Sequence, residues 1–196
     1  MSVGKTLVDN FRQHFVDLEE AAAAVPFRVF LCGPKISLHK KEPAAAVRSS
    51  LRDRLEAEGF DVILGEDEGL NNSEIEGLGI NAQDNELIYI AKNCNAVIIV
   101  AGSVGSYCEL GLFSWHFASP AGLFKSGTDF ILIVDKKYRK HKSYFNLGPA
   151  TSVNGGRGLI CFVDFNKFDV RKLIKRLKDQ RGITRATRAI PRKSGQ

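Results

Sequence analysis

The sequence predicts an α/β protein built on a three-layer, doubly wound sheet of about five parallel strands. Two observations support this prediction. Short apolar runs rich in β-branched residues alternate with longer segments whose apolar residues recur at helical spacing. Several of the apolar runs also end on turns that contain glycine. Strands that alternate with helices favour a parallel sheet covered on both faces.

The elements follow in order along the chain. A helix is expected over residues 5–24, where Leu7, Phe11 and Phe15 keep a spacing of four and Pro26 ends the pattern. Strands are expected over 27–32, 60–64, 97–100, 130–135 and 159–164, and further helices over 43–58, 81–92, 107–118 and 167–179. Residues 71–79 are expected to form a mobile loop, and 136–151 a basic loop. The right-handed crossover rule leaves few topologies, and among them we expect the five-stranded flavodoxin-like strand order.

Charge is distributed unevenly along the 196 residues. The segment 166–196 carries eleven Lys and Arg and two Asp, a net charge of +9. The other 165 residues carry 17 Lys and Arg and 20 Asp and Glu, a net charge of −3, so the chain totals +6. We predict one α/β domain over residues 1–180 with a basic, flexible tail over 181–196. Such asymmetry suggests an acidic or nucleic-acid partner, although a solvated helix face also explains it.

Cysteine and histidine usage predicts neither a disulfide framework nor a metal site. The four cysteines lie in or beside apolar segments without a C-x-x-C pair, which is typical of reduced, cytoplasmic proteins. His39 and His116 have no partner at metal spacing, so we expect no metal and no cofactor. No apolar run approaches the length of a membrane span. Trp115 and Phe117 are expected to be core or oligomer contacts, and we predict a homo-oligomer.

The turn after the third strand is the candidate functional site. It supplies Gly102, Ser103, Gly105 and Ser106 ahead of a helix that carries Glu109. Ligands of open α/β sheets bind outside the carboxyl ends of the strands, and helix N-termini favour anions there. A sugar or phosphate site is one interpretation. The other is a capping box, with Ser106 as N-cap and Glu109 reaching back to it.

The segment 103–111, Ser-Val-Gly-Ser-Tyr-Cys-Glu-Leu-Gly, resembles the D-x-G-[ST]-x-x-E-L-G motif of nucleoside 2-deoxyribosyltransferase-like proteins. Residues 30–34, which end in Gly33 and Pro34, resemble that family's first strand and Gly-Pro loop. The likeness covers roughly residues 27–119. Within it, retron-encoded toxin (effector) proteins of bacterial anti-phage defence are most similar. A looser likeness joins the turn to phosphoribohydrolases that resemble lysine decarboxylases.

The resemblance implies an N-glycosidase that releases the base from a nucleotide. Glu109 would attack or stabilise the anomeric carbon, Asp84 would orient it, and the helix N-terminus would keep it ionised. The implied substrate-binding residues are Gly33, Pro34, Gly102, Ser103, Gly105 and Ser106. Ser103 stands where the family has an aspartate that helps to read the base. The implied partners are a nucleotide, a reverse transcriptase and its RNA–DNA product.

The substrate stays open between a purine nucleotide and NAD. Nicotinamide leaves as a neutral molecule and needs no strong acid, whereas a purine usually needs a proton. Two other classes of function fit the sequence: a non-catalytic nucleotide sensor, and a basic module that binds nucleic acid. Residues 136–142 interleave Tyr138 with cations and suit phosphate contacts, or they form a flexible basic loop. Arg48 and Arg52 could pair with phosphate or form a solvated helix face.

Overall fold

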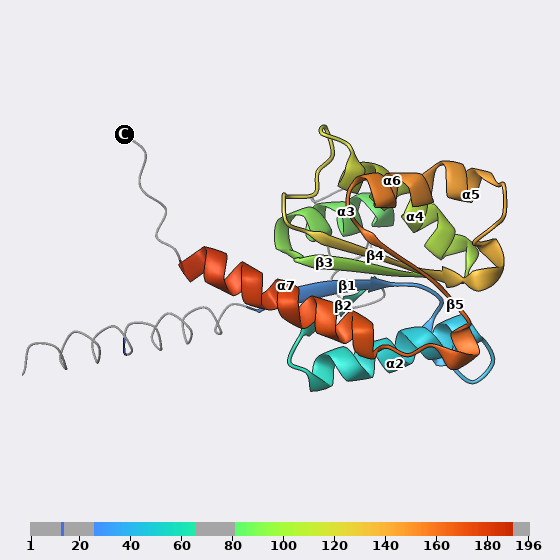
Figure 1. Cartoon of the computed structure of the whole chain (residues 1–196), viewed down its shortest axis with the longest axis horizontal. Helices are drawn as coiled ribbons and strands as arrows, with labels where there is room; N and C mark the ends of the chain where they lie inside the picture. The colour runs from blue at the N-terminus through green and yellow to red at the C-terminus, as the bar shows by residue number, and fades with distance from the viewer. Residues whose placement is uncertain (1–12, 14–25, 66–80, 190–196) are drawn as a thin grey trace, which may run out of the picture. The chain divides into compact units, whose positions relative to one another are not determined.

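The computed structural model contains a five-stranded, all-parallel sheet in the order β2-β1-β3-β4-β5 (Figure 1). The predicted fold class and strand order are therefore confirmed. The strands are β1 Arg28–Cys32, β2 Asp61–Leu64, β3 Ala96–Ala101, β4 Asp129–Asp135 and β5 Leu159–Val163. The structure describes residues 13, 26–65 and 81–189. The predicted helix over 5–24, apart from Gln13, and the predicted loop over 71–79 lie outside these residues.

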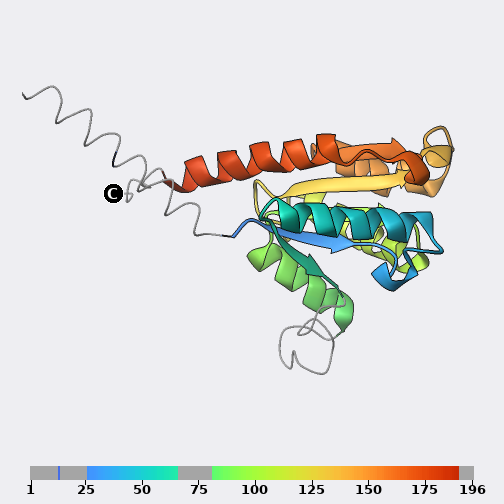
Figure 2. The ribbon, with the colours of Figure 1, turned by 90° about the horizontal axis from the view of Figure 1, so that it is seen from below.

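Helices cover both faces of the sheet. The α-helices are α2 Pro43–Ala57, α3 Ala82–Asn93, α4 Val104–Ala118, α5 Tyr144–Leu147, α6 Pro149–Gly155 and α7 Arg171–Ala189, and the 3₁₀ turns are η1 Ile36–Leu38, η2 Lys136–Tyr138 and η3 Phe165–Lys167. Helices α3, α4, α5 and α6 lie on one face (Figure 1). Helix α2 lies on the other, where it contacts β1, β2 and β3 (Figure 2).

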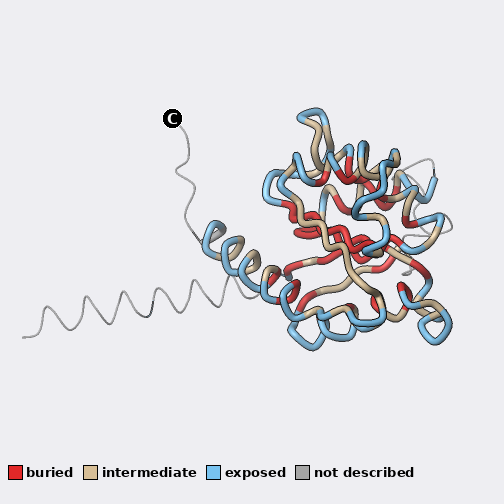
Figure 3. Tube along the Cα trace, turned by 45° about the vertical axis from the view of Figure 1, so that its right-hand side comes forward, coloured by how far each residue is buried: buried red, intermediate tan, exposed pale blue. Residues whose placement is uncertain are grey.

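The core follows the central strands. Every residue of β3 is buried, whereas every residue of the edge strand β5 is only partly buried. Buried positions gather along the middle of the sheet, and exposed ones lie on the outer sides of the helices (Figure 3). Rings pack beneath α4, where the centroids of Phe30 and Phe113 lie 6.4 Å apart. Strands buried on both faces read as continuous apolar runs, which is why the sequence revealed them.

Two segments contain more helix than expected. The predicted basic loop over 136–151 holds η2, α5 and the start of α6, because Pro149 begins α6 and Asn146 bonds two carbonyls of the preceding turn. Helix α7 continues to Ala189, beyond its expected end at residue 179. Arginine, lysine and alanine propagate a helix well, and a single Gly182 does not stop it.

The chain divides into two compact units. One is Phe27–Ile174, which contains the sheet, and the other comprises Met1–Pro26 and Lys175–Gln196. The site described below lies within Phe27–Ile174. Among the described residues, no helix is long and apolar enough to cross a membrane.

Candidate functional site

The turn between β3 and α4 is closed by two serines. Ser103 is the N-cap of α4, and its Oγ accepts the N–H of Ser106 at 3.3 Å. The Ser106 Oγ accepts the N–H groups of Gly102 at 3.0 Å and Ser103 at 2.9 Å, and it donates to the Ser103 carbonyl at 2.8 Å. Ser106 is buried. The alternative interpretation of Ser106 and Glu109 as a capping box is therefore wrong, because α4 begins three residues earlier than predicted.

Replacing Ser106 with alanine should destabilise the protein by about 0.5–1.5 kcal/mol, since it removes the acceptor of two backbone N–H groups in a partly buried turn. Urea unfolding followed by far-UV circular dichroism would measure the loss. Ser126→Ala, on an exposed turn, is the matched control and should change stability by less than about 0.5 kcal/mol. Equal effects of the two substitutions would show that the Ser106 bonds do not hold the turn.

Glu109 occupies the second turn of α4. Ser106, Leu110 and Phe113 form the buried stripe of the helix. At 3.6 residues per turn, Tyr107 and Glu109 project to opposite sides of that stripe. Glu109 is partly buried, and its Oε2 atom is fully covered. The dipole of a helix acts mainly within its first turn. The second-turn position of Glu109 therefore weakens the stabilisation of its ionised form that we expected from the helix N-terminus.

A second carboxylate, Glu86 on α3, shares this region. Burial, and then the charges of Glu109 and Glu86, raise the pKa of the Cys32 thiol at the end of β1. Both carboxylates therefore act electrostatically on the thiol that ends β1. Glu86 is buried, and its Oε1 packs so closely against Gly65 that a Cβ on that glycine would overlap it. We call Glu109, Glu86 and Cys32 the carboxylate cluster.

Asp84, the expected helper, occupies the first turn of α3. Its backbone N–H donates to Asn81 Oδ1 at 3.0 Å, and its side chain is partly exposed. Sequence reasoning missed Glu86, two positions further on. A usable signal existed, because Glu86 precedes the buried Ile90 by four residues and therefore shares its helix face.

Gly33 and Pro34 form the turn after β1, and buried Arg48 fixes that turn. The guanidinium donates to the Leu31 carbonyl from Nη2 at 2.7 Å and to the Pro34 carbonyl from Nη1 at 3.1 Å. Gly33 has a φ of +149°, and a Cβ there would lie 3.0 Å from Arg48 Cδ. The glycine is thus required by packing. Arg48 is 2% exposed, so it forms neither a phosphate site nor a solvated face.

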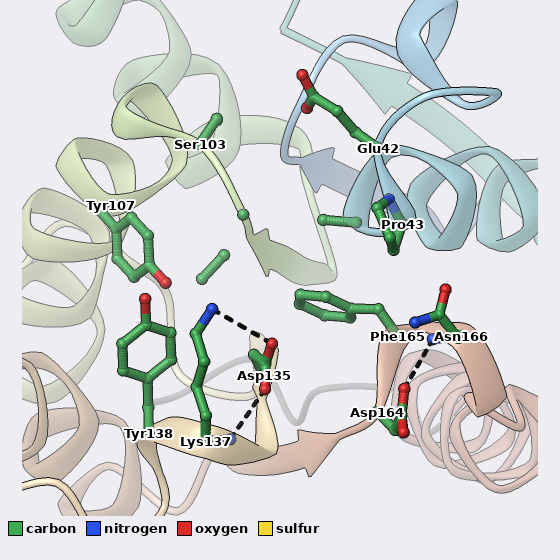
Figure 4. Close-up of a pocket in the computed structure, with 13 residues that line it drawn as sticks. Glu42, Pro43, Ser103, Tyr107, Asp135, Lys137, Tyr138, Asp164, Phe165 and Asn166 are labelled. Carbon is green, nitrogen blue, oxygen red and sulfur yellow. Dashed lines mark hydrogen bonds and ion pairs between the residues drawn. The ribbon is translucent and has the colours of Figure 1, made fainter.

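A pocket of about 510 Å³ opens at the carboxyl ends of β3, β4 and β5 (Figure 4). Of the predicted substrate-binding residues, Gly102 and Ser103 line it. Gly102 also allows the turn after β3 to approach the start of α2 closely, because a Cβ on this residue would overlap Ala44. The other lining residues are Glu42, Pro43, Ala44, Ala101, Tyr107, Asp135, Lys137, Tyr138, Asp164, Phe165 and Asn166. Glu109, Asp84, Gly33, Pro34, Gly105 and Ser106 are outside this set.

Two aspartates at the strand ends are anchored in the same way. Asp135 Oδ1 accepts the N–H of Lys137 at 2.9 Å, and Asp164 Oδ1 accepts the N–H of Asn166 at 3.1 Å. Each second oxygen faces a lysine, with Lys137 Nζ 3.5 Å from Asp135 and Lys136 Nζ 2.9 Å from Asp164. These contacts cap η2 and η3 and fix the pocket wall.

An aromatic cluster joins α4 to the segment after β4. The ring centroid of Tyr107 lies 6.3 Å from that of Tyr138 and 6.1 Å from that of Phe145. The two tyrosine hydroxyls point toward each other, and Phe165 extends into the pocket (Figure 4). Burial, followed by the hydrogen bond with Tyr138, raises the pKa of Tyr107. Tyr107 lines the pocket, and the raised pKa favours the neutral phenol there.

The chain matches a known protein family over most of its length. A family model described as STM3845 retron effector protein matches residues 44–195. No curated protein and no solved structure matches the chain significantly. In the described residues, no group of three or more His, Cys, Asp or Glu side chains could hold a metal ion.

Proposed function

The chain belongs to the STM3845 retron effector family, and from this premise we propose that it is an N-glycosidase of anti-phage defence. It would hydrolyse the bond between base and sugar in a purine nucleotide or NAD, with Glu109 as nucleophile or charge stabiliser. The observation that carries this proposal is the position of Glu109: a partly buried carboxylate, near the start of the helix that follows the central strand, with Glu86 nearby.

The reaction needs a fixed negative charge. As the base leaves, positive charge develops on the sugar ring, and a carboxylate answers it by covalent attack or by electrostatics. Glu109 is carried by α4, and its Oε2 atom is covered by the surrounding protein. A carboxylate fixed in this way would be in position before substrate arrives. Glu86 would take the orienting role that we expected of Asp84.

The helix start offers a place for phosphate. The N–H groups of Ser106 and Tyr107 are bonded within the cap, to Ser103 Oγ and to the Ser103 carbonyl. Those of Val104 and Gly105 precede the first intrahelical bond and remain for water or an anion. Gly105 is exposed, and a Cβ there would meet no atom within 4 Å, so a ligand can approach closely. This arrangement favours a phosphorylated substrate over a free nucleoside.

The test is chromatography of free bases after incubation of the purified chain with NAD, ATP, dATP, CMP and dCMP. Release of nicotinamide or a purine from one of them is the expected result, and its identity names the substrate. The assay is repeated with the retron's reverse transcriptase and RNA–DNA product, which are expected to hold the effector silent. Saturable nucleotide binding without any released base, under both conditions, would instead support a nucleotide sensor.

A further inference from the structure

The segment from Lys136 to Lys142 is a fixed basic surface at the mouth of the pocket. Its carbonyls at Tyr138 and His141 accept hydrogen bonds from Asn146 Nδ2 at 2.7 Å and 2.6 Å. The ring of Tyr138 packs against Tyr107 and Phe145, with centroids 6.3 Å and 6.0 Å away. The segment is therefore held to α4 and α5, and the alternative of a flexible loop does not describe it.

Three cations of this segment face solvent. Lys136 and Lys137 pair with Asp164 and Asp135. Arg139, Lys140 and Lys142 are exposed, and within the described residues no ion pair involves them. Three positive charges within four residues, without acidic partners, suit an anion of repeating charge better than a single carboxylate.

An apolar strip adjoins these cations. Tyr144 and Leu147 begin and end α5, one helical turn apart, and are 83% and 76% exposed. An exposed tyrosine beside cations offers a stacking face, and a base can use it only when it is unpaired, because a duplex hides the faces of its bases. A partner protein with an acidic surface would match the charges, but its acidic side chains would not stack on the exposed ring of Tyr144.

We propose that Arg139, Lys140, Lys142 and Tyr144 form a binding surface for single-stranded nucleic acid. The cations contact successive phosphates, and Tyr144 stacks on one base. Because the same segment supplies Lys137 and Tyr138 to the pocket, a bound strand lies beside the pocket mouth. This inference does not depend on base release, so the two proposals can fail separately.

Fluorescence anisotropy of the full chain with a labelled oligothymidine tests the cations. The triple substitution Arg139→Ala, Lys140→Ala and Lys142→Ala should reduce the slope of log affinity against log salt by about two, at about 0.7 for each phosphate that is no longer neutralised. The matched control replaces the exposed Lys35, Lys40 and Lys41 with alanine, which removes the same charge after β1. Equal reductions in the two variants, or no reduction in the first, would overturn the proposal.

A strand that lacks its bases tests the stacking. Tyr144→Ala should weaken binding to oligothymidine by about 5- to 100-fold. It should leave binding to an abasic strand of equal length unchanged. If both strands weaken alike, or if a duplex binds as tightly as the single strand, Tyr144 does not read unpaired bases and the surface is a general electrostatic one.

Discussion

Replacing Glu109 with glutamine is expected to reduce base release by at least about 10³-fold while the chain stays folded. Glutamine keeps the shape of the side chain but removes the negative charge that the developing cation requires. Glu109 lies outside the Ser103–Ser106 cap, so the substitution leaves the cap bonds intact. The measurement is the initial rate of base release, accompanied by far-UV circular dichroism and equilibrium dialysis with the nucleotide.

Three further substitutions define the result. Glu56→Gln, on the exposed side of α2, removes the same charge at a remote place and should leave the rate unchanged. Glu86→Gln should lower the rate by about 10- to 100-fold, and Asp84→Asn by less than about tenfold, since Glu86 is buried and belongs to the carboxylate cluster, whereas Asp84 is partly exposed and lies outside it. Full activity in Glu109→Gln would remove the proposed nucleophile. A larger loss of rate in Asp84→Asn than in Glu86→Gln would return the orienting role to Asp84, as expected from the sequence.

The sheet could be predicted because its signal is local. Each buried strand reads as an apolar run, and the crossover rule leaves few topologies for strands that alternate with helices, among them the flavodoxin-like order that we favoured. The start of α4 could not be placed in the same way. Two capping pairs are possible here: Ser103 as N-cap with Ser106 three residues later, or Ser106 as N-cap with Glu109 three residues later. Local sequence preference does not decide between them. The tertiary structure decides, because Ser106 becomes buried and bonds the end of β3.

The candidate site was predicted in part. Gly102 and Ser103 line the pocket, since they follow the central strand directly. Asp135 and Asp164 were missed as pocket residues, although each ends a predicted strand and the carboxyl ends of parallel strands meet at one edge. The aromatic pair of Tyr107 and Tyr138 could not be found from sequence, because the contact joins segments separated by a whole strand.

Arg48 is expected to be the most sensitive structural position near the site. Arg48→Ala should lower the free energy of unfolding by about 3–5 kcal/mol, because it leaves the buried carbonyls of Leu31 and Pro34 without their donors and opens a cavity. Urea unfolding followed by far-UV circular dichroism measures this decrease. Base release should also fall, since the turn that contains Gly33 loses its support beside the carboxylate cluster.

Two variants separate hydrogen bonding from packing. Arg48→Met fills much of the same volume but has no hydrogen-bond donors. The difference in the free energy of unfolding between this variant and the native chain therefore measures the contribution of the hydrogen bonds. Arg52→Ala, one helical turn further along α2, removes a partly exposed guanidinium that pairs with Asp53 at 2.8 Å and should cost no more than about 1 kcal/mol. If Arg48→Ala and Arg52→Ala prove equally mild, the guanidinium of Arg48 does not organise the end of β1. A large decrease in Arg48→Ala alone would show that a buried cation, fixed by backbone carbonyls, holds the first strand's turn in place for the site.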